Sequence, residues 1–366
     1  MTEQKSAPEE LKKEIKVEET PKEEIKKLIE EKPKPKPDPR RRLFKSDRMI
    51  IVAPAPHNKG KHSVPRIMYT VIDALLPAII VSLLLFGTKA MVTILVAVFA
   101  AMVAEYACNK IMKTGLTIDD GSAILTGILL AMTLPPSFPI AGTALGAVVA
   151  IVFGKQVFGG LGANIFNPAL LGRAFLQASF PVKITTWTLP AFAGVDAVSG
   201  ATPLGQFFSP DKIETPVREL LLGNVGGCIG ETSAIALLIG GIILVILKYA
   251  DWRIPLSYIG TVFVFSGILW LVNPAVYPNP LFMVFSGGLI LGAFFMATDM
   301  VTSPVTPRGT WIYGIGMGIV LMVIRVWGGL PEGVMYSILF MNGLVPLLNR
   351  WTRPKYFGEI QKERKK

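Results

Sequence analysis

Long apolar runs are the feature that most constrains this chain. Between residues 67 and 349 they recur with few charges inside them, and each lasts about 20 residues, the length needed to cross the hydrocarbon core of a bilayer. A soluble α/β protein would carry shorter apolar runs between polar faces. The composition agrees, with 51% hydrophobic and 17% charged residues and a mean hydropathy of +0.50. We therefore predict a polytopic membrane protein rather than a soluble enzyme.

Ten transmembrane segments can be placed on these runs, several of them short or interrupted by Gly and Pro. The expected fold class is accordingly all-α. The predicted spans are residues 67–87, 89–109, 120–135, 139–158, 164–181, 228–248, 254–272, 281–299, 309–327 and 332–349.

The net charge of +11 is concentrated at the two flanks of this hydrophobic body. Residues 1–40 and residues 67–349 each sum to zero, whereas residues 41–66 carry +6 and residues 350–366 carry +5. Basic flanks beside apolar spans are typical of a cytoplasmic side; a nucleic-acid binder would place its charge on a folded face. Both termini are therefore predicted to be cytoplasmic. The even number of spans agrees with this, because it places both termini on the same side of the membrane.

This charge map also predicts the domain organisation. Residues 1–40, rich in Lys, Glu and Pro, are expected to be a disordered cytoplasmic extension without a signal peptide, followed by a basic juxtamembrane segment, 41–66, and a basic tail at 350–366. The longest loop, residues 182–227, then lies outside the membrane on the far side. It separates a first transmembrane half, 67–181, from a second, 228–349.

An internal repeat relates the two halves. The run GILLAMTLPPSFP at residues 127–139 matches GAFFMATDMVTSP at residues 292–304 with a constant offset of 165, and a Gly-Gly-Leu triplet follows each run. Each half would hold five spans, an odd number, so the second half is expected to be inverted relative to the first. Inverted repeats with broken helices are typical of transporters.

Four motifs stand out along the chain. The first, DAVSGAT at residues 196–202, is by composition an ordinary small-residue turn. The others are FGGLGANIFNPALLGRAF at residues 158–175, FFMATDMVTSPVT at residues 294–306, and the span at residues 325–350. In order and spacing, the four resemble segments of one membrane family, which contains the D subunit of the Rnf electron-transport complex and the B subunit of the sodium-translocating NADH:quinone reductase. The resemblance covers roughly residues 45–355.

The resemblance implies a covalent flavin. DAVSGAT is similar to the family's D-x-x-[ST]-G-A-T motif, in which FMN is attached through its phosphate to the threonine hydroxyl, here Thr202. Ser199, Gly200 and Ala201 would leave that hydroxyl in a flexible, open loop that a flavin transferase can enter. Asp196 is expected to orient the loop or to be recognised by the transferase, because a carboxylate repels a phosphate. The sequence departs from the family at Ala197, where Gly is frequent, and at Met300, where Pro is frequent.

The other motifs suggest further cofactor contacts. Asn164 and Asn167 in the Gly-rich motif offer amide groups suited to an isoalloxazine edge, and the resemblance allows a second, non-covalent flavin there; close helix packing through small residues explains the same pattern equally well. Thr298 and Asp299 follow in the third motif. Asp299 is the strongest candidate for contact with a flavin or a coupling cation.

Ionisable groups inside spans are functional candidates because each costs roughly 2.5–3.5 kcal/mol on insertion scales. Besides Asp299, they are Asp73, Glu105 and Arg173. Glu105, a weaker candidate for a coupling cation, is alternatively expected to reach interfacial water with Lys110 as its partner. A buried structural ion pair would account for Arg173 as well as a cofactor contact does.

Taken together, the sequence and the resemblance predict a flavin-carrying subunit of an ion-translocating ferredoxin:NAD⁺ oxidoreductase in the bacterial inner membrane. It would relay electrons through FMN and couple this to Na⁺ or H⁺ movement. The implied partners are an FMN-carrying subunit on the outer side, NAD- and ferredoxin-reacting subunits, and the flavin transferase. The chain's own GGLGAN run lacks a G-x-G-x-x-G fingerprint, so no NAD site is expected.

Three alternatives stay open at this point. The chain resembles the Rnf subunit more than the quinone-reductase subunit in length once residues 1–40 are set aside, but either homologue fits the motifs. A solute channel or transporter would show the same inverted repeat, and a cofactor-free scaffold for partner subunits would too. Cys108 and Cys228 stand too far apart for a metal-ligand motif and are expected to be small buried residues.

Overall fold

A computed structural model describes residues 63–115, 117–189, 199–209, 215–231, 233–328 and 332–354. The predicted extension at 1–40, nearly all of the basic segment at 41–66, and the end of the tail lie outside these residues. The described chain is helical apart from one two-stranded ladder. It is an all-α membrane fold, as the apolar runs predicted.

The first half begins with two long apolar helices joined by a tight turn at Gly87, whose φ is +61°. Shorter helices follow, one of which continues into a π-helical turn. The elements are α2 (Val64–Phe86), α3 (Thr88–Met112), η2 (Ile118–Asp120), α4 (Ser122–Met132), α5 (Ile140–Ile151), η3 (Val152–Gln156) and α6 (Pro168–Ser179).

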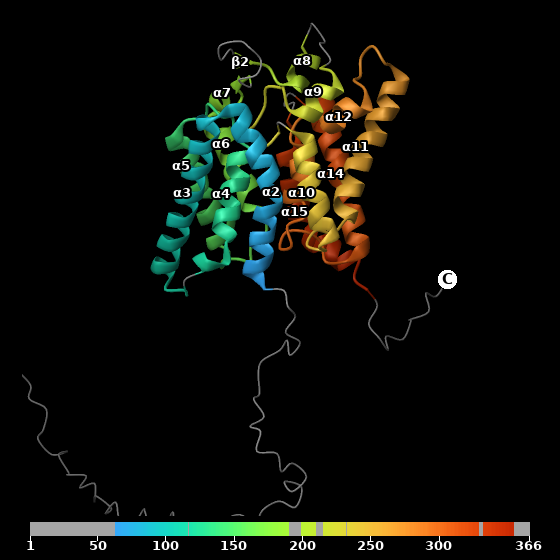
Figure 1. The fold of residues 1–366 in the computed structure, drawn as a ribbon. Helices are drawn as coiled ribbons and strands as arrows, with labels where there is room; N and C mark the ends of the chain where they lie inside the picture. Colours follow the sequence, from blue (N-terminus) through green and yellow to red (C-terminus); the bar gives the residue numbers. More distant parts are fainter. Residues whose placement is uncertain are drawn as a thin grey trace, which may run out of the picture. The chain divides into compact units, whose positions relative to one another are not determined.

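The connection between the halves gathers at one end of the bundle, which we call the loop end; the opposite end, where Ser63 and Pro354 lie, is the terminal end (Figure 1). The two strands pair antiparallel, with Trp187 opposite Gly200. The connecting elements are α7 (Pro181–Ile184), β1 (Trp187–Thr188), β2 (Ser199–Gly200), α8 (Pro203–Phe207) and α9 (Val217–Leu222).

The second half is more broken than the sequence suggested. The span predicted at 281–299 is three short pieces, because Gly287, at φ +69°, interrupts the helix that begins at Pro280. The span predicted at 228–248 starts only at Ala234, since residues 228–231 form a loop. The elements are α10 (Ala234–Ile246), α11 (Arg253–Val272), α12 (Pro280–Phe285), α13 (Leu289–Leu291), η5 (Gly292–Met296), α14 (Pro307–Trp327) and α15 (Val334–Trp351).

Four of these helices are long and apolar enough to cross a membrane by length and composition, namely α2, α3, α11 and α14. The remaining predicted spans correspond to shorter helices or to helices with breaks. The count of ten spans therefore stays a prediction, as do the domain boundaries.

The two halves repeat one packing order. In the first half α3 packs against α4 and α5, and α5 against α6; in the second, α11 packs against α12 and α14, and α14 against α15. The matched runs occupy equivalent places in this order, since 127–139 ends α4 and precedes α5 while 292–304 contains η5 and precedes α14. One run leads to the loop end and the other to the terminal end (Figure 1), which is the inverted relation that the repeat predicted.

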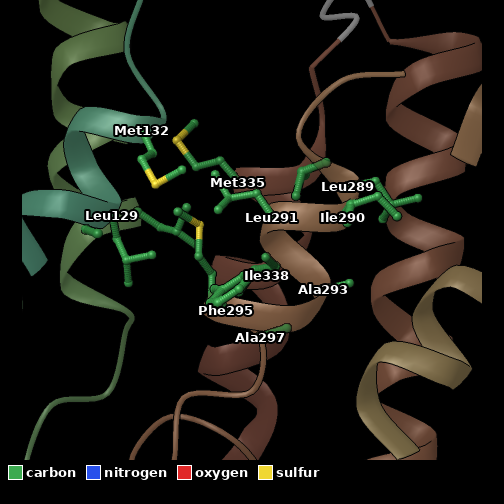
Figure 2. Packing of buried hydrophobic residues seen from close by; sticks show 14 of the residues in the cluster. Leu129, Met132, Leu289, Ile290, Leu291, Ala293, Phe295, Ala297, Met335 and Ile338 are labelled. Carbon is green, nitrogen blue, oxygen red and sulfur yellow. The ribbon is translucent and has the colours of Figure 1, made fainter. Parts of the chain in front are cut away.

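The core joins the halves with apolar side chains of both. Leu129 and Met132 of α4 point toward Met335 of α15 and Leu291 of α13, and Phe295 of η5 lies beside them (Figure 2). All five are nearly inaccessible. This contact fixes the pseudo-symmetric halves against each other and separates two polar regions, one toward each end.

Glycine allows the closest helix approaches. A Cβ on Gly240 of α10 would lie 1.9 Å from the carbonyl oxygen of Ala74 in α2, and one on Gly314 of α14 would lie 1.8 Å from Oγ of Ser257 in α11. Such small-residue contacts stabilise helix packing in a membrane through van der Waals interactions. The hydrophobic effect does not drive helices together there, because lipid tails are themselves apolar.

Candidate functional site

Thr202 lies at the loop end and begins α8. Its backbone is extended, and its Oγ1 accepts a hydrogen bond from the backbone N–H of Gly205 at 3.1 Å. The side chain is only 5% exposed. The expectation of an open threonine was therefore wrong for this structure, because Thr202 lies on the wall of a small cavity that it shares with Leu220, Val225 and Phe285.

The rest of the acceptor motif is described only in part. Ser199 and Gly200 form β2, and Ala201 is exposed and accepts a hydrogen bond from Nε2 of Gln206 at 3.2 Å. Asp196 lies outside the described residues. The structure thus places Thr202 between a short ladder and a short helix.

A cavity adjoins Thr202 and contains charge. Two carboxylates, Glu231 and Glu332, line it together with Gly287 and apolar residues of α8 and α12. A Cβ on Gly287 would meet both Nη2 of Arg325 and Cδ1 of Leu204 at 3.1 Å. The glycine turn therefore brings the guanidinium of Arg325 close to the wall of the Thr202 cavity.

Arg325 is fully buried in α14, and its neighbours are backbone carbonyls. Nη1 donates to the carbonyl of Met283 at 2.6 Å and Nη2 to that of Ser286 at 3.0 Å. These are the carbonyls that the break after α12 releases from helical pairing. Nε has no partner among the described residues, so one donor of a buried cation is left over.

Below the Thr202 cavity lies a central polar cluster of Arg173, Cys228, Glu231 and Glu332. Nη2 of Arg173 pairs with Oε2 of Glu332, and Nη1 contacts Sγ of Cys228 at 3.2 Å. Sγ of Cys228 also donates to the carbonyl of Thr133 at 2.9 Å, and the backbone N–H of Cys228 donates to Oε2 of Glu231 at 3.3 Å. The cluster ties α6 of the first half to the segments that precede α10 and α15.

This cluster has the donor types of a metal site, since Sγ of Cys228 and one oxygen of each carboxylate lie within 4.8 Å of one another. Arg173, however, already occupies the position between the thiol and Glu332. A guanidinium supplies the positive charge that an ion would bring, so we interpret the group as an ion-pair cluster. The structural ion pair expected as one explanation of Arg173 is confirmed.

Sequence reasoning missed Glu231 and Glu332. Both lie at the start of predicted spans, 228–248 and 332–349, and were passed over among the charges inside spans; in the structure they lie just before α10 and α15. The available signal was Glu332 itself, an acid in a motif that resembles the family and would face Arg173 if the halves pack together.

A second cavity lies toward the terminal end and brings the other predicted residues together. Its wall includes Asn164, Asn167, Thr298 and Asp299, with Lys155 and Ser122 beside them. The two halves both contribute, because the asparagines precede α6 and the other pair follows η5. The repeat thus assembles one polar cavity from two distant motifs.

Asn164 and Asn167 differ in how many of their side-chain hydrogen-bonding groups have a partner. Oδ1 of Asn167 caps α6 by accepting from the N–H groups of Ala169 and Leu170, and Nδ2 donates to the carbonyl of Met296 at 3.2 Å. Nδ2 of Asn164 donates to the carbonyl of Phe166 at 3.3 Å, but its Oδ1 has no partner among the described residues. Asn167 is therefore structural in this state, while Asn164 has a free acceptor.

The Gly-rich turn before these asparagines uses glycine for its backbone angles, whereas the close backbone approach expected there is not seen, since a Cβ on Gly162 would meet nothing within 4 Å. Gly159, Gly160 and Gly162 all have positive φ, between +95° and +112°. Such angles are rare for any residue with a Cβ. The turn therefore depends on glycine and sets the position of Asn164.

Thr298 and Asp299 are bonded within their own segment. Oγ1 of Thr298 donates to the carbonyl of Phe294 at 2.6 Å, and Oδ2 of Asp299 accepts from Oγ1 of Thr302 at 3.1 Å. Asp299 makes no ion pair within the described chain, and it keeps its place on the cavity wall.

Glu105 is paired differently from the expectation. Its partner is Lys155 of η3, with Nζ 2.7 Å from Oε1, and Oγ1 of Thr117 donates to the same oxygen at 2.6 Å. Both charged side chains are essentially inaccessible. The predicted pairing with Lys110 was wrong, because η3 packs against α3 and brings a lysine inside the helix bundle. Of the other ionisable candidates, Asp73 is exposed on α2.

Comparison with known proteins extends over nearly the whole chain. The model of the NQR2, RnfD, RnfE family matches residues 51–358. The D subunit of the proton-translocating ferredoxin:NAD(+) oxidoreductase complex of Clostridium ljungdahlii is 44% identical over 320 residues, which are 85% of this chain and 96% of the relative. The D subunit of the Na(+)-translocating ferredoxin:NAD(+) oxidoreductase complex of Acetobacterium woodii is 43% identical over 86% of this chain and 98% of its own. The D subunit of an ion-translocating oxidoreductase complex of Stutzerimonas stutzeri is 40% identical over 81% and 93%.

Proposed function

Because the chain belongs to the NQR2, RnfD, RnfE family, we propose that it is the D subunit of an ion-translocating ferredoxin:NAD(+) oxidoreductase complex. The observation that carries this proposal is the extent of the likeness: the three relatives align over at least 81% of this chain and at least 93% of their own. Each of these relatives is a D subunit. The chain would act as a membrane-embedded part of the redox-driven translocase, within a complex that supplies the ferredoxin and NAD sites.

We propose that FMN is attached to Thr202 through a phosphoester. The support is the acceptor motif together with the position of Thr202, on the wall of a cavity lined by charged side chains. Bound FMN would supply the redox chemistry that no side chain can supply. Arg325 lies behind Gly287, and its Nε has no partner among the described residues, but it does not line this cavity. The charged residues that do line it, Glu231 and Glu332, oppose an anion, so the attachment proposal rests on the acceptor motif.

The burial of Thr202 restricts when FMN can be attached to it. Oγ1 of Thr202 is buried and holds the N–H of Gly205, so α8 has to open before a transferase reaches the hydroxyl. We expect attachment to the chain before the loop end has packed, or after local opening of this five-residue helix. Opening would have to expose Pro203, Leu204 and Phe207, which are buried in α8, so attachment before packing is the route that we favour.

The test is flavin attachment in the full chain. Co-expressed with a flavin transferase, the chain should give a fluorescent band on a denaturing gel and an intact mass raised by one FMN residue. Thr202→Ala should lose both signals, and Thr202→Ser, which keeps a hydroxyl, should retain part of them. Thr202→Ala that still carries covalent flavin would overturn the site, and a colourless wild-type chain would leave a channel or scaffold as the better function.

A second flavin, bound without a covalent bond, is proposed for the terminal-end cavity. The observation that favours it is the unpartnered Oδ1 of Asn164, an acceptor that a ring N–H of an isoalloxazine can satisfy. Thr298 and Asp299 line the same wall. Flavin released by mild denaturation of the Thr202→Ala chain would support this site, and its loss in Asn164→Ala would locate it.

The coupling ion is left to experiment, because relatives of nearly equal identity are named for different ions, protons in one and Na⁺ in the other. Asp299 and Glu105 remain the proposed cation contacts, although Lys155 already neutralises Glu105. Sodium-dependent and proton-dependent uptake in vesicles containing the whole complex would distinguish the two.

We propose that the terminal end is cytoplasmic and that the complex resides in the inner membrane. The support is the distribution of basic side chains. Those near the terminal end are Lys110, Lys113, Lys248, Arg253, Arg308, Arg350 and Arg353, against Lys89, Lys183 and Arg218 near the loop end. The loop end, with Thr202, would then face the FMN-carrying partner on the outer side.

A further inference from the structure

An apolar groove opens on the side of the second half. Its walls come from α10, α11 and α12, and Phe294 of η5 closes its floor. The groove has a volume of about 470 Å³, within the usual range of ligand sites. It exists because α12 is short and Gly260 of α11 has no side chain, and a Cβ there would meet nothing within 4 Å.

The groove is matched to one leaflet in length. Along α11 its lining runs from Trp252 to Phe263, which at 1.5 Å per residue is about 16 Å. Half of the roughly 30 Å hydrocarbon core is about the same length. Several lining side chains are about half exposed, among them Ile242, Leu256 and Phe263. An acyl chain standing beside α11 would cover these side chains over its full depth.

A polar cavity continues the groove at the terminal end. The two share Val245 and Trp252 on their walls, and the polar cavity also contains Lys248, Asp251 and Arg253. Trp252 stacks edge-on against Trp311 with ring centroids 6.0 Å apart. Tryptophan is enriched at the depth of lipid headgroups, so the junction of groove and cavity has the character of the membrane interface.

The charge of the polar cavity favours an anion. Arg253 pairs with Asp251 at 3.4 Å, with both side chains one-third exposed, and these two charges offset each other. Lys248 is exposed and has no ion-pair partner in the described chain. It holds a left-handed backbone with φ +60° at the end of α10, which directs the chain from α10 into the cavity wall.

We propose that this combined surface binds an anionic phospholipid of the terminal-end leaflet, with one acyl chain in the groove and the phosphate headgroup at Lys248 and Arg253. The order of features along the surface is that of a lipid: an apolar channel, an interfacial tryptophan and a basic headgroup pocket. Basic pockets between transmembrane helices select anionic headgroups. This site does not rest on the proposed redox function. Its headgroup pocket nevertheless borders the terminal-end cavity, because the two share Tyr249, Ala250, Thr298 and Met300.

The test measures lipid retained by the full chain. Purified protein in a non-ionic detergent is incubated with phosphatidylglycerol or with phosphatidylcholine of the same acyl chains, and bound lipid is counted by native mass spectrometry. Phosphatidylglycerol should be retained in preference, and Lys248→Gln should reduce that preference about fivefold, equivalent to the roughly 1 kcal/mol that one basic residue contributes near a membrane surface. Lys113→Gln, on the same end but away from the groove, is the matched control and should leave it unchanged.

The groove is tested separately from the headgroup pocket. Gly260→Leu fills the groove without a steric clash and should reduce retention of both lipids, whereas Gly267→Leu, on the same helix but outside the groove lining, should not. If Gly260→Leu fails to accumulate, Leu256→Trp narrows the groove from its exposed wall and serves the same purpose. Unchanged retention in a folded groove variant overturns the proposal. Equal retention of phosphatidylglycerol and phosphatidylcholine also overturns the proposal. It would indicate that a neutral apolar ligand or a partner helix occupies the groove instead.

Discussion

Two ion pairs are buried in the part of the chain that the structure describes, and they are built differently. Glu105 and Lys155 pair within the first half, with both side chains at most 2% exposed. Arg173 and Glu332 pair between the halves, with side chains 7% and 15% exposed. The first pair, here called the enclosed pair, lies within one half, and only Lys155 reaches a cavity wall. The second pair lies between the Thr202 cavity and a somewhat larger one, and both of those cavities are lined by Glu231 and Glu332.

The difference indicates which region can change charge during function. In the enclosed pair, each side chain is the counterion that neutralises the charge of the other. The second pair shares its surroundings with Glu231 and Arg325, so its charge can be redistributed or hydrated. The interface between the halves, rather than the interior of one half, is therefore where we expect charge to respond to a nearby flavin.

The largest effect should come from breaking the enclosed pair. Glu105→Gln leaves the ammonium of Lys155 buried without a counterion, and removing one partner of a buried pair destabilises by about 3–5 kcal/mol. The measurement is the midpoint of thermal unfolding in detergent. The double variant Glu105→Gln/Lys155→Met should recover most of the loss, because no charge is then left uncompensated. A double variant as unstable as Glu105→Gln would show that the pair is not the cause.

A smaller effect is expected from Arg173→Gln. The variant removes one charged hydrogen bond to Glu332, which contributes about 1.5–3 kcal/mol, but the neighbouring cavities admit water to the remaining carboxylate. The same unfolding measurement on both variants compares the two pairs directly. A loss in Arg173→Gln equal to or larger than that in Glu105→Gln would contradict the distinction between an enclosed and a shared pair.

The smallest effect should separate the two asparagines of the terminal-end cavity. Asn167→Ala removes the cap of α6, which typically costs about 1 kcal/mol. Asn164→Ala removes only a long bond to the carbonyl of Phe166, so its unfolding midpoint should hardly move. If Asn164→Ala proves the more destabilising, the unpartnered Oδ1 is not a free ligand group and the proposed second flavin loses its support.

Much of the fold follows from local sequence. The positions of α2, α3, α11 and α14 agree closely with the predicted spans, because an uninterrupted apolar run of that length has few other structures open to it. The break at Gly287 was missed because the Ser-Gly-Gly run at residues 286–288 does not by itself reveal that Gly287 has a positive φ. The late start of α10 was missed for a related reason: residues 228–231 are held by backbone bonds to residues 132–134, which are distant in sequence.

The candidate sites also contain some residues that the sequence could identify and others that it could not. Thr202, Asn164 and Asp299 were identified from motifs, and the structure places Asn164 and Asp299 on one cavity wall. The partners of Glu105 and Arg173 could not be identified, because Lys155 and Glu332 are 50 and 159 residues away along the chain. The burial of Thr202 likewise could not be predicted, because Leu220, Val225 and Phe285, which line the same cavity, belong to no motif that contains Thr202.

By itself, the sequence determined that this is a helical membrane protein with a repeated architecture, and it identified the residues whose chemistry suits a flavin. Hydropathy and motif spacing are properties of the local sequence, so they can be recognised without knowledge of how the chain packs. The tertiary structure alone decided which charges neutralise each other, which acceptor is left free at Asn164, and that the hydroxyl of Thr202 is covered. Those outcomes depend on contacts between residues far apart in the sequence, some within one half and some between the halves, and such contacts form only when the helices pack together.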